Sequence, residues 1–347
     1  MSPMKKWYVI LMSMILVFTL SACKDAKDKV LEDGKVDKAE ASDSKKKDKK
    51  KEETFSSVFP LTGIGTNDEI DQRAVAVMVN NHWKARPQSG LHKADIVYEV
   101  LAEGELTRFL AIFQSEMPET VGPVRSARDY YIELSRGYNA LYVAHGYSPE
   151  AKEMLYSGTV DHLNGMDYDG SLFNRADFRK APHNSYITSE NILRGMDKVG
   201  ADQTDDLDML RFLTKTSSVN IEGEPAKDVT VDYGRGETVG FTYSEKKKTY
   251  ARSSNNEPTI DRETETPISV SNVFIVEAAH RVIDDAGRRQ INLTSGGDAI
   301  LIQNGVAQNI SWRNENGRIV PDGGAFIPGK TWINIVPSGM ENSVKMQ

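Results

Sequence analysis

The sequence contains a single cysteine, Cys23, among 347 residues. One thiol cannot form a disulfide within the chain, and it cannot build a cysteine-rich zinc site. After the N-terminal region, no stretch approaches the about 20 apolar residues that a membrane-spanning helix requires. Zinc-binding histidine spacings, EF-hand loops, P-loops and dinucleotide-binding fingerprints are also absent from the sequence. The sequence therefore predicts no metal site and no bound cofactor.

The N-terminus combines positive charge with a short apolar segment. Lys5 and Lys6 precede Trp7–Leu20, which has the length of a signal-peptide hydrophobic region and is short for a membrane span. The run ends in Leu20-Ser21-Ala22-Cys23, which resembles the bacterial lipobox. These features predict lipidation of Cys23 by palmitate or a related acyl chain. Because acyl chains contribute about 0.8 kcal/mol per buried methylene, two chains would anchor the protein to the extracytoplasmic face of the cell membrane.

The segment after the lipobox, residues 24–53, contains eleven lysines and ten acidic residues. Such a composition buries too little apolar surface to offset its chain entropy, so it predicts a disordered tether with a reach of about 30 Å. Of the formal net charge of −7, the signal peptide and tether account for +3, which leaves −10 for residues 54–347. An acidic extracytoplasmic domain argues against nucleic-acid binding.

Residues 54–215 mix strand and helix patterns. Apolar runs predict strands at Ala74–Asn80, Asp95–Leu101, Thr107–Gln114 and Asn139–His145. Helical spacing and capping signals predict helices at Ser126–Gly137, from Ser148-Pro149 onward, at Ser189–Val199 and at Asp205–Thr214. The segment Glu103-Gly104-Glu105 predicts a hairpin turn. This part is predicted to be a mixed α/β lobe with a partly antiparallel sheet.

Residues 216–347 contain short strand patterns and turn signals without a helix pattern. The turn signals are Asp285-Ala286-Gly287, Asn304-Gly305 and Asn316-Gly317. The predicted strands, in a β-meander, are Val273–Ala278, Gln290–Thr294, Ala299–Gln303, Ala307–Trp312 and Thr331–Val336. The polar stretch Ser253–Thr266 predicts a long loop. The chain is thus predicted to be α+β, with a signal peptide (1–23), a tether (24–53), an α/β lobe (54–215) and a mostly antiparallel β lobe (216–347).

The segment Gly122–Arg128 leads from a strand into a helix N-terminus and carries Arg125, Ser126 and Arg128. Free backbone N–H groups at a helix start favour an anion, and arginine forks suit phosphate or carboxylate. This pattern predicts an anion-binding site. The alternative is that Ser126 is only an N-cap and that the arginines pair with nearby acids.

Three further groups of residues could complete this site. The irregular segment Arg175–Asn184 contributes Arg179, Lys180 and His183, with a solvated charged loop as the alternative. His145 follows a strand end, where ligand crevices often form, and Asn80-Asn81-His82 ends another strand as a turn that could face the crevice. Arg108 lies on a predicted strand of the same lobe. Ser148 lacks the G-x-S-x-G context of a nucleophile.

Taken together, the motifs resemble the YerB-like lipoproteins, a domain family of unknown function found in Firmicutes. The resemblance rests on Arg73–His82, Ala85–Leu91, Ala94–Glu99, Thr107–Ala111, Gly122–Arg128, Ser148–Ala151, Lys180–Asn184 and Gly329–Ile333. It spans nearly all of the chain after Phe55, although Ser253–Thr266 departs from the usual family pattern. It implies an anchored envelope protein with an α/β lobe and a β-rich lobe, and it implies no activity.

The sequence leaves three hypotheses for function. The favoured one is a tethered module that binds an anionic envelope ligand or a protein partner. The predicted ligand-binding residues are Asn80, Arg108, Arg125, Ser126, Arg128, His145, Arg179, Lys180 and His183. The second is an enzyme that acts on phosphorylated cell-wall precursors with an aspartate or histidine base. The third is a structural scaffold. Convergence of the arginines and His183 would favour the ligand hypotheses, and an adjacent free carboxylate would favour the enzyme.

Overall fold

The structure, a computed structural model, describes residues 55–214, 220–234 and 236–347. The predicted signal peptide, Cys23 and the tether lie outside the described residues. The predicted lobe boundary between residues 215 and 216 also lies outside them and stays a prediction. By their contacts, both predicted lobes belong to one unit, Glu53–Gln347.

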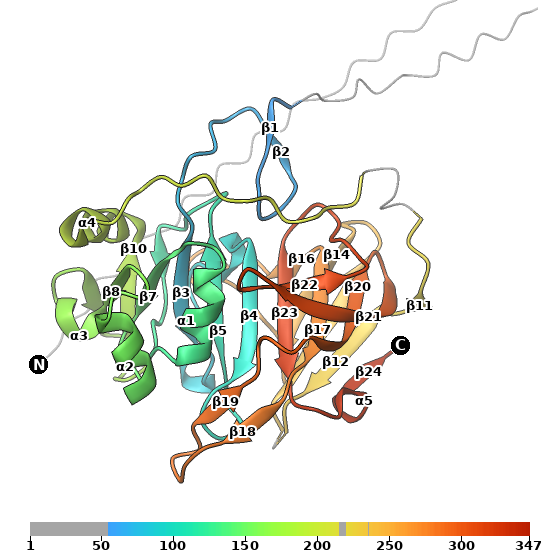
Figure 1. Cartoon of the computed structure of the whole chain (residues 1–347). Helices are drawn as coiled ribbons and strands as arrows, with labels where there is room; N and C mark the ends of the chain where they lie inside the picture. The colour runs from blue at the N-terminus through green and yellow to red at the C-terminus, as the bar shows by residue number, and fades with distance from the viewer. Residues whose placement is uncertain (1–54, 215–219, 235) are drawn as a thin grey trace, which may run out of the picture. The chain divides into compact units, whose positions relative to one another are not determined.

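The largest sheet in this part of the chain contains strands from both halves of the sequence (Figure 1). β23 pairs in parallel with β17 on one side and with β4 on the other, so backbone hydrogen bonds join the two halves. In order across the sheet, the strands are β11 (Glu224–Pro225), β21 (Val306–Glu315), β20 (Gly297–Gln303), β17 (Asn272–Glu277), β23 (Thr331–Val336), β4 (Ile96–Leu101), β5 (Thr107–Phe113), β3 (Val75–Asn80), β7 (Leu141–Ala144) and β8 (His162–Asn164), with β22 (Arg318–Asp322) pairing with β21.

The central strands β3, β4, β5 and β23 are buried along their whole length. Val75, Val77 and Val79 of β3 pack in the core on one face of the sheet. Ala76 and Met78, between them, pack in the core on the other face. Because successive side chains of a strand point to opposite faces, a strand covered on both sides needs a continuous apolar run.

A second, antiparallel sheet packs against the first of these cores. Its strands are β15 (Glu257–Pro258), β14 (Thr249–Ser254), β13 (Thr238–Ser244), β12 (Asp228–Asp232) and β24 (Val344–Met346), with β16 (Ser269–Val270) pairing with β14. β12 alternates exposed and buried residues, as expected for a sheet with one face in water. Its buried Val229 and Val231 share a core with Phe109 and Trp332 of the central sheet.

Helices cover the opposite face. Ile132 of α1 (Asp129–Arg136) and Leu155 of α2 (Pro149–Tyr156) belong to the second core. Ser148 caps α2 by accepting a hydrogen bond from the Ala151 N–H, as the Ser-Pro pair predicts. The other elements are β1 (Ser57–Val58), β2 (Gly65–Thr66), η1 (Trp83–Ala85), η2 (Leu91–Lys93), β6 (Thr120–Val121), α3 (Gly165–Tyr168), β9 (Phe173–Arg175), β10 (Ser185–Thr188), α4 (Ser189–Val199), β18 (His280–Val282), β19 (Arg289–Ile291) and α5 (Met340–Ser343).

The predicted fold class is confirmed. The N-terminal half has helices with a partly antiparallel sheet, and the C-terminal half is mostly antiparallel strand. The four strands predicted in the N-terminal half and the helix at Ser189–Val199 are present within two residues of their predicted ends. Asn304-Gly305 and Asn316-Gly317 turn β20 into β21 and β21 into β22, with positive φ at all four residues. This is the backbone conformation that Asn-Gly hairpin turns adopt.

The predicted helix at Asp205–Thr214 is wrong. The segment is irregular, and the backbone N–H groups of Asp205, Leu210 and Leu213 donate to carbonyls of three other segments. Three aspartates within four residues also weaken a helix, because aspartate has low helix propensity. The tertiary contacts of the segment therefore replace the hydrogen bonds that a helix would have made.

Smaller predictions also need correction. The helix predicted from Ser126 begins at Asp129, and Ser126 does not cap it, because its Oγ donates to the His145 carbonyl instead. Thr331–Val336 is a strand but not part of a meander, since its pairing with both neighbours is parallel. The predicted loop at Ser253–Thr266 includes the end of β14 and all of β15, and the C-terminal half contains the short helix α5.

Candidate functional site

Polar residues gather where β3 and β7 end. β3 ends at Asn80 and β7 ends directly before His145. These strands are parallel, so their carboxyl ends lie at the same edge of the sheet. Arg125 lies in a segment between them: its N–H donates to the Met78 carbonyl, and its carbonyl accepts from the His145 N–H, both at 2.9 Å. Ligand crevices commonly form at such an edge. We call this region the β3–β7 edge.

Two histidines stack at the β3–β7 edge, with ring centroids of His82 and His183 4.6 Å apart. The Asn80 Oδ1 accepts the His82 N–H, which fixes the orientation of the amide. The Asn80 Nδ2 therefore donates to His183 Nδ1 at 2.9 Å. Likewise, His82 Nδ1 accepts from the Lys84 N–H at 3.1 Å. A neutral imidazole has one donor and one acceptor nitrogen, so both rings carry their proton on Nε2.

The surroundings of both histidines favour the neutral form. Burial lowers the pKa of His82, and the positive charges of Lys84 and Arg125 lower it further. Burial also lowers the pKa of His183, together with His82 and Arg125. A bound anion would raise both pKa values, because it stabilises the protonated ring. The two rings can therefore donate to an anion at neutral pH and gain positive charge beside it in acid.

Arg125 is a partly buried cation without a side-chain partner. Within residues 55–214, 220–234 and 236–347, its guanidinium makes no hydrogen bond and no ion pair. Burial lowers its pKa, as does the neighbouring charge of Arg128, while Glu103 acts in the opposite direction. An arginine keeps its proton even so, and its planar fork suits phosphate or carboxylate oxygens. Its positive charge also acts on His82, His145 and His183.

Arg108 and Arg128, in contrast, are already engaged. Arg108 donates to Glu103 Oε2 at 2.6 Å and to the Ser126 carbonyl at 3.1 Å. Arg128 forms an ion pair with the same carboxylate. Burial alone would raise the pKa of Glu103, but the two arginines lower it overall. Burial and the charge of Arg128 lower the pKa of Arg108 to about 10. These two predicted ligand residues make their hydrogen bonds and ion pairs within the protein, so they do not offer free donors to a ligand.

The predicted residues of the Arg175–Asn184 segment have separate roles. Arg179 donates to the carbonyls of Ala85 at 2.7 Å and Pro87 at 2.6 Å, and so ties this segment to the turn after β3. The Lys180 side chain is exposed, while its carbonyl accepts the His183 N–H at 3.0 Å. Only His183 of the three reaches Asn80 and His82.

The hydrogen bonds of His145 hold it in a tautomer that cannot act as the base for the neighbouring Ser185. Its Nε2 lies 2.8 Å from an Arg175 N–H group, which can only donate. Its proton therefore lies on Nδ1, which donates to Ser185 Oγ at 2.8 Å. In this arrangement the ring cannot accept the serine proton, as a general base must. Burial lowers the pKa of His145, and Arg175 adds to the effect.

The structure thus brings Asn80, Arg125 and His183 together with His82. His82 is not among the predicted ligand residues, although the turn Asn80-Asn81-His82 is predicted to be able to face the crevice. The signal that could have found it is its position directly after a buried strand, at the carboxyl end where crevices form. Ser126 and His145 border the same edge through their mutual hydrogen bond.

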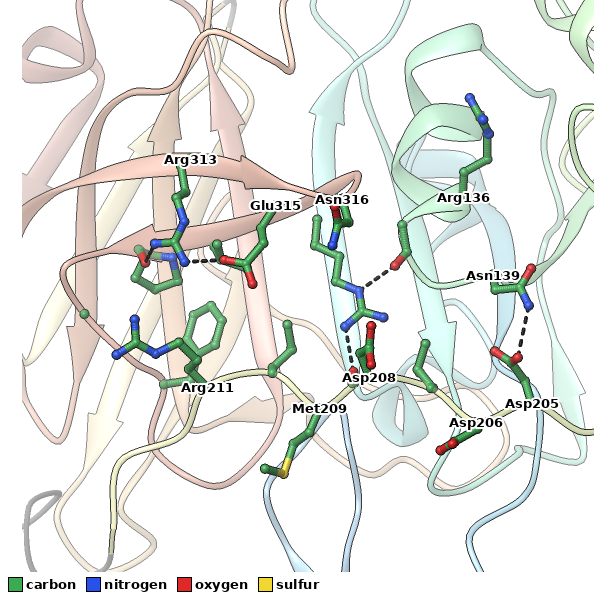
Figure 2. A pocket seen from close by; sticks show the side chains of 18 residues that line it. Arg136, Asn139, Asp205, Asp206, Asp208, Met209, Arg211, Arg313, Glu315 and Asn316 are labelled. Carbon is green, nitrogen blue, oxygen red and sulfur yellow. Dashed lines mark hydrogen bonds and ion pairs between the residues drawn. The ribbon is translucent and has the colours of Figure 1, made fainter.

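A cavity of about 500 Å³ lies elsewhere, beside the Asp205–Arg211 segment (Figure 2), and includes none of the predicted ligand residues. An ion pair and a hydrogen bond engage charged residues of its lining. Figure 2 shows Arg313 directed at Glu315 and Asn139 at Asp205. The β3–β7 edge, in contrast, brings together the predicted ligand residues Asn80, Arg125 and His183, and is therefore the better candidate site.

No group of three or more histidine, cysteine, aspartate or glutamate side chains in residues 55–214, 220–234 and 236–347 is arranged to hold a metal ion. Among the helices of the same residues, none has the length and apolar character to cross a membrane.

The fold and the site define an α+β protein with a β-rich C-terminal half and a polar edge at the ends of two parallel strands. The chain belongs to the DUF3048 family. The N-terminal domain of this "Protein of unknown function (DUF3048)" matches residues 61–202, and its C-terminal domain matches residues 229–333. The chain is 47% identical over 345 residues to "Putative lipoprotein YerB" of Bacillus subtilis strain 168, covering 96% of each chain. It also resembles the crystal structure of the YerB protein from Bacillus subtilis, with a TM-score of 0.78 and 49% identity over 84% of this chain and 99% of that one.

Proposed function

We propose that the chain is a lipoprotein, anchored through Cys23 to the extracytoplasmic face of the cell membrane, that binds an anionic ligand of the envelope at the β3–β7 edge. The anchor is supported by the lipobox-like Leu20-Ser21-Ala22-Cys23 and by the Bacillus subtilis relative, which is named a putative lipoprotein. Acylation at a single cysteine also agrees with a chain that has no other thiol.

The anchor predicts selective lipid labelling. Cells grown with labelled palmitate should incorporate the label into the wild-type chain in the membrane fraction. The Cys23→Ser variant should carry no label, because the chain has no other cysteine to accept an acyl chain. Labelled Cys23→Ser protein would contradict the proposed anchor.

One observation carries the ligand proposal: His82 and His183 present Nε2–H donors beside Arg125, and Arg125 has no side-chain partner among the described residues. A buried or half-buried cation is normally paired, because desolvation makes an isolated charge costly. Neutral donors and one guanidinium form a site for a small anion such as phosphate or carboxylate.

The geometry supports binding better than catalysis. An enzyme acting on a phosphorylated precursor needs a general base within hydrogen-bond reach of the nucleophile. The carboxylates whose charges act on Arg125 and His82 are Glu103 and Glu237. Glu103 pairs with two arginines and Glu237 with Arg86, so both are already engaged. A purely structural role does not account for unpaired donors at this edge, because an unpaired, partly buried charge costs free energy.

The proposal predicts that Arg125→Met weakens the binding of pyrophosphate to the full chain, measured by isothermal titration calorimetry. A hydrogen bond to a charged group contributes about 1.5–3 kcal/mol. Since each 1.4 kcal/mol is a factor of ten, the affinity should fall by about 10- to 100-fold.

The matched control is Arg136→Met, which removes an exposed arginine that lines the other cavity (Figure 2). It should leave pyrophosphate affinity unchanged. If Arg136→Met abolished binding and Arg125→Met did not, the anion site would be the cavity beside Asp205–Arg211. If pyrophosphate did not bind the wild-type chain, the ligand proposal would be wrong.

A further inference from the structure

A groove of about 420 Å³ adjoins the β3–β7 edge. One wall is the turn after β3, which begins at His82, and the other is the β14–β15 hairpin from the C-terminal half. Most of the surface that lines it is apolar, and one tryptophan and two prolines contribute to it. The lining residues are Trp83, Arg86, Pro87, Gln88, Ser254, Asn255, Glu257, Pro258, Thr259 and Ile260.

Trp83 is the most exposed large apolar side chain among the described residues, at 65%. Two neighbouring side chains contact the Trp83 ring. The His82 ring stacks against it with centroids 5.3 Å apart, and Lys84 Nζ lies 4.9 Å from the centroid of the indole. The indole therefore contacts one member of the stacked His82–His183 pair. An exposed indole beside polar groups is a platform for a partly apolar ring.

Gln88 supplies an unsatisfied acceptor in the lining of the groove. The residue is 1% exposed, and its Nε2 donates to the Asn80 carbonyl at 3.1 Å and to Asn81 Oδ1 at 3.2 Å. Within the described residues, its buried Oε1 receives no hydrogen bond. Buried polar atoms nearly always have a partner, so this oxygen is an open acceptor for an O–H or N–H group of a ligand that enters the groove.

The opposite wall carries polar groups that face solvent. Asn255 and Glu257 are exposed at the end of the β14–β15 hairpin. Pro258 occupies the edge strand β15 and has no N–H to donate. A peptide strand cannot extend this sheet edge in the usual way, because the proline interrupts the row of donors.

We infer that this groove binds the sugar ring of an acidic saccharide, whose charged group reaches Arg125 and the two histidines. A pyranose ring has an apolar C–H face that can stack on Trp83 and hydroxyls that can pair with Gln88, Asn255 and Glu257. The charge arrangement agrees, because the positive charge of Arg125 acts on His82, whose ring stacks against Trp83. This inference rests on the proposed function and names the chemical class of its ligand.

The experiment compares four probes by titration calorimetry with the full chain. Pyrophosphate tests the anion site alone, and chitotetraose is a neutral sugar. A hyaluronan tetrasaccharide carries carboxylates, and N-acetylglucosamine 1-phosphate carries a phosphate, which separates the two sources of charge. At least one acidic sugar should bind more tightly than both pyrophosphate and chitotetraose.

Trp83→Ala should weaken binding of the tighter acidic sugar by about tenfold, equivalent to about 1.4 kcal/mol. Trp83→Phe should retain part of the affinity, because a smaller ring still stacks. Tyr156→Ala, which removes an exposed aromatic ring on α2, is the matched control and should have no effect. The acidic sugar should also shift tryptophan emission in the wild type, and this shift should vanish in Trp83→Phe.

The outcomes separate the two proposals. If pyrophosphate fails to bind the wild-type chain, the anion site itself is wrong. If pyrophosphate binds but no sugar gains affinity over it, or Trp83→Ala has no effect, only the saccharide inference is overturned. Equal binding of chitotetraose and the acidic sugars would overturn the role of the charged group. Competition by an extended peptide would reassign the groove to peptide docking.

Discussion

Replacing Glu99 by glutamine should lower the free energy of unfolding by about 3–5 kcal/mol, the usual cost of removing one partner from a buried ion pair. Glu99 on β4 and Arg252 on β14 are both fully buried, and they face each other with N–O distances down to 2.8 Å. The variant leaves a guanidinium without its counter-charge in a dry interior. Urea unfolding of the wild type and Glu99→Gln, followed by circular dichroism, measures the difference.

The pair is embedded in a network that joins the two halves of the sequence. Trp332 Nε1 donates to Glu99 at 2.9 Å, and Thr107 Oγ1 donates to it at the same distance. The guanidinium of Arg252 lies 5.1 Å from the Phe109 ring and 4.6 Å from the Trp332 ring. Because these groups come from both halves, disrupting the pair weakens the contact between the two sheets.

A double-mutant cycle tests this explanation. Arg252→Met should destabilise by a similar amount, and the double variant Glu99→Gln/Arg252→Met should be clearly less destabilised than the sum of the two. The matched control is Glu315→Gln, which breaks an exposed pair with Arg313 and should change stability by less than about 1 kcal/mol. Additive effects of Glu99→Gln and Arg252→Met would contradict the buried-pair account.

Acidification from pH 6.5 to pH 4 should destabilise the protein by about 3 kcal/mol through His280 alone, at about 1.4 kcal/mol per unit of pKa shift. Burial lowers the pKa of His280 to about 4. Its Nδ1 donates to the Ala278 carbonyl at 2.8 Å, so Nε2 must take the second proton. Within the described residues, Nε2 is buried and has no acceptor.

The direction of the pH effect follows from the two states. Between pH 6.5 and 4 the unfolded chain protonates this histidine while the folded chain does not, so acid favours unfolding. The stabilising effect of the neutral ring is complete above pH 6.5 and is lost as the pH falls toward 4. The pKa values of His82, His145 and His183 are also lowered, so they add to the effect in the same direction.

The variant His280→Asn isolates the contribution of His280. Asparagine can still donate to the Ala278 carbonyl, but it does not titrate in this range. Thermal or urea unfolding at several pH values should show a shallower loss of stability in the variant than in the wild type, and the other histidines cancel in the comparison. Identical pH profiles for the two proteins would rule out His280 as the source.

The sequence by itself determined the local structure well. Continuous apolar runs predicted β3, β4, β5 and β23 because a strand buried on both faces needs them. Asn-Gly pairs predicted two hairpin turns, and Ser148-Pro149 predicted a helix start, since these residues act through their own backbone geometry. The helix prediction at Asp205–Thr214 was wrong for the opposite reason. The hydrogen bonds of this segment are made with distant segments, which local patterns do not encode.

Only the tertiary structure decided which cations are available to a ligand. Arg108, Arg125 and Arg128 look equivalent in sequence, but Glu103 folds back onto two of them and leaves Arg125 unpaired. The tautomer of His183 is likewise set by Asn80, 103 residues away. A charged side chain takes its role from the nearest partner in space, and that partner is supplied by how the strands pair and pack.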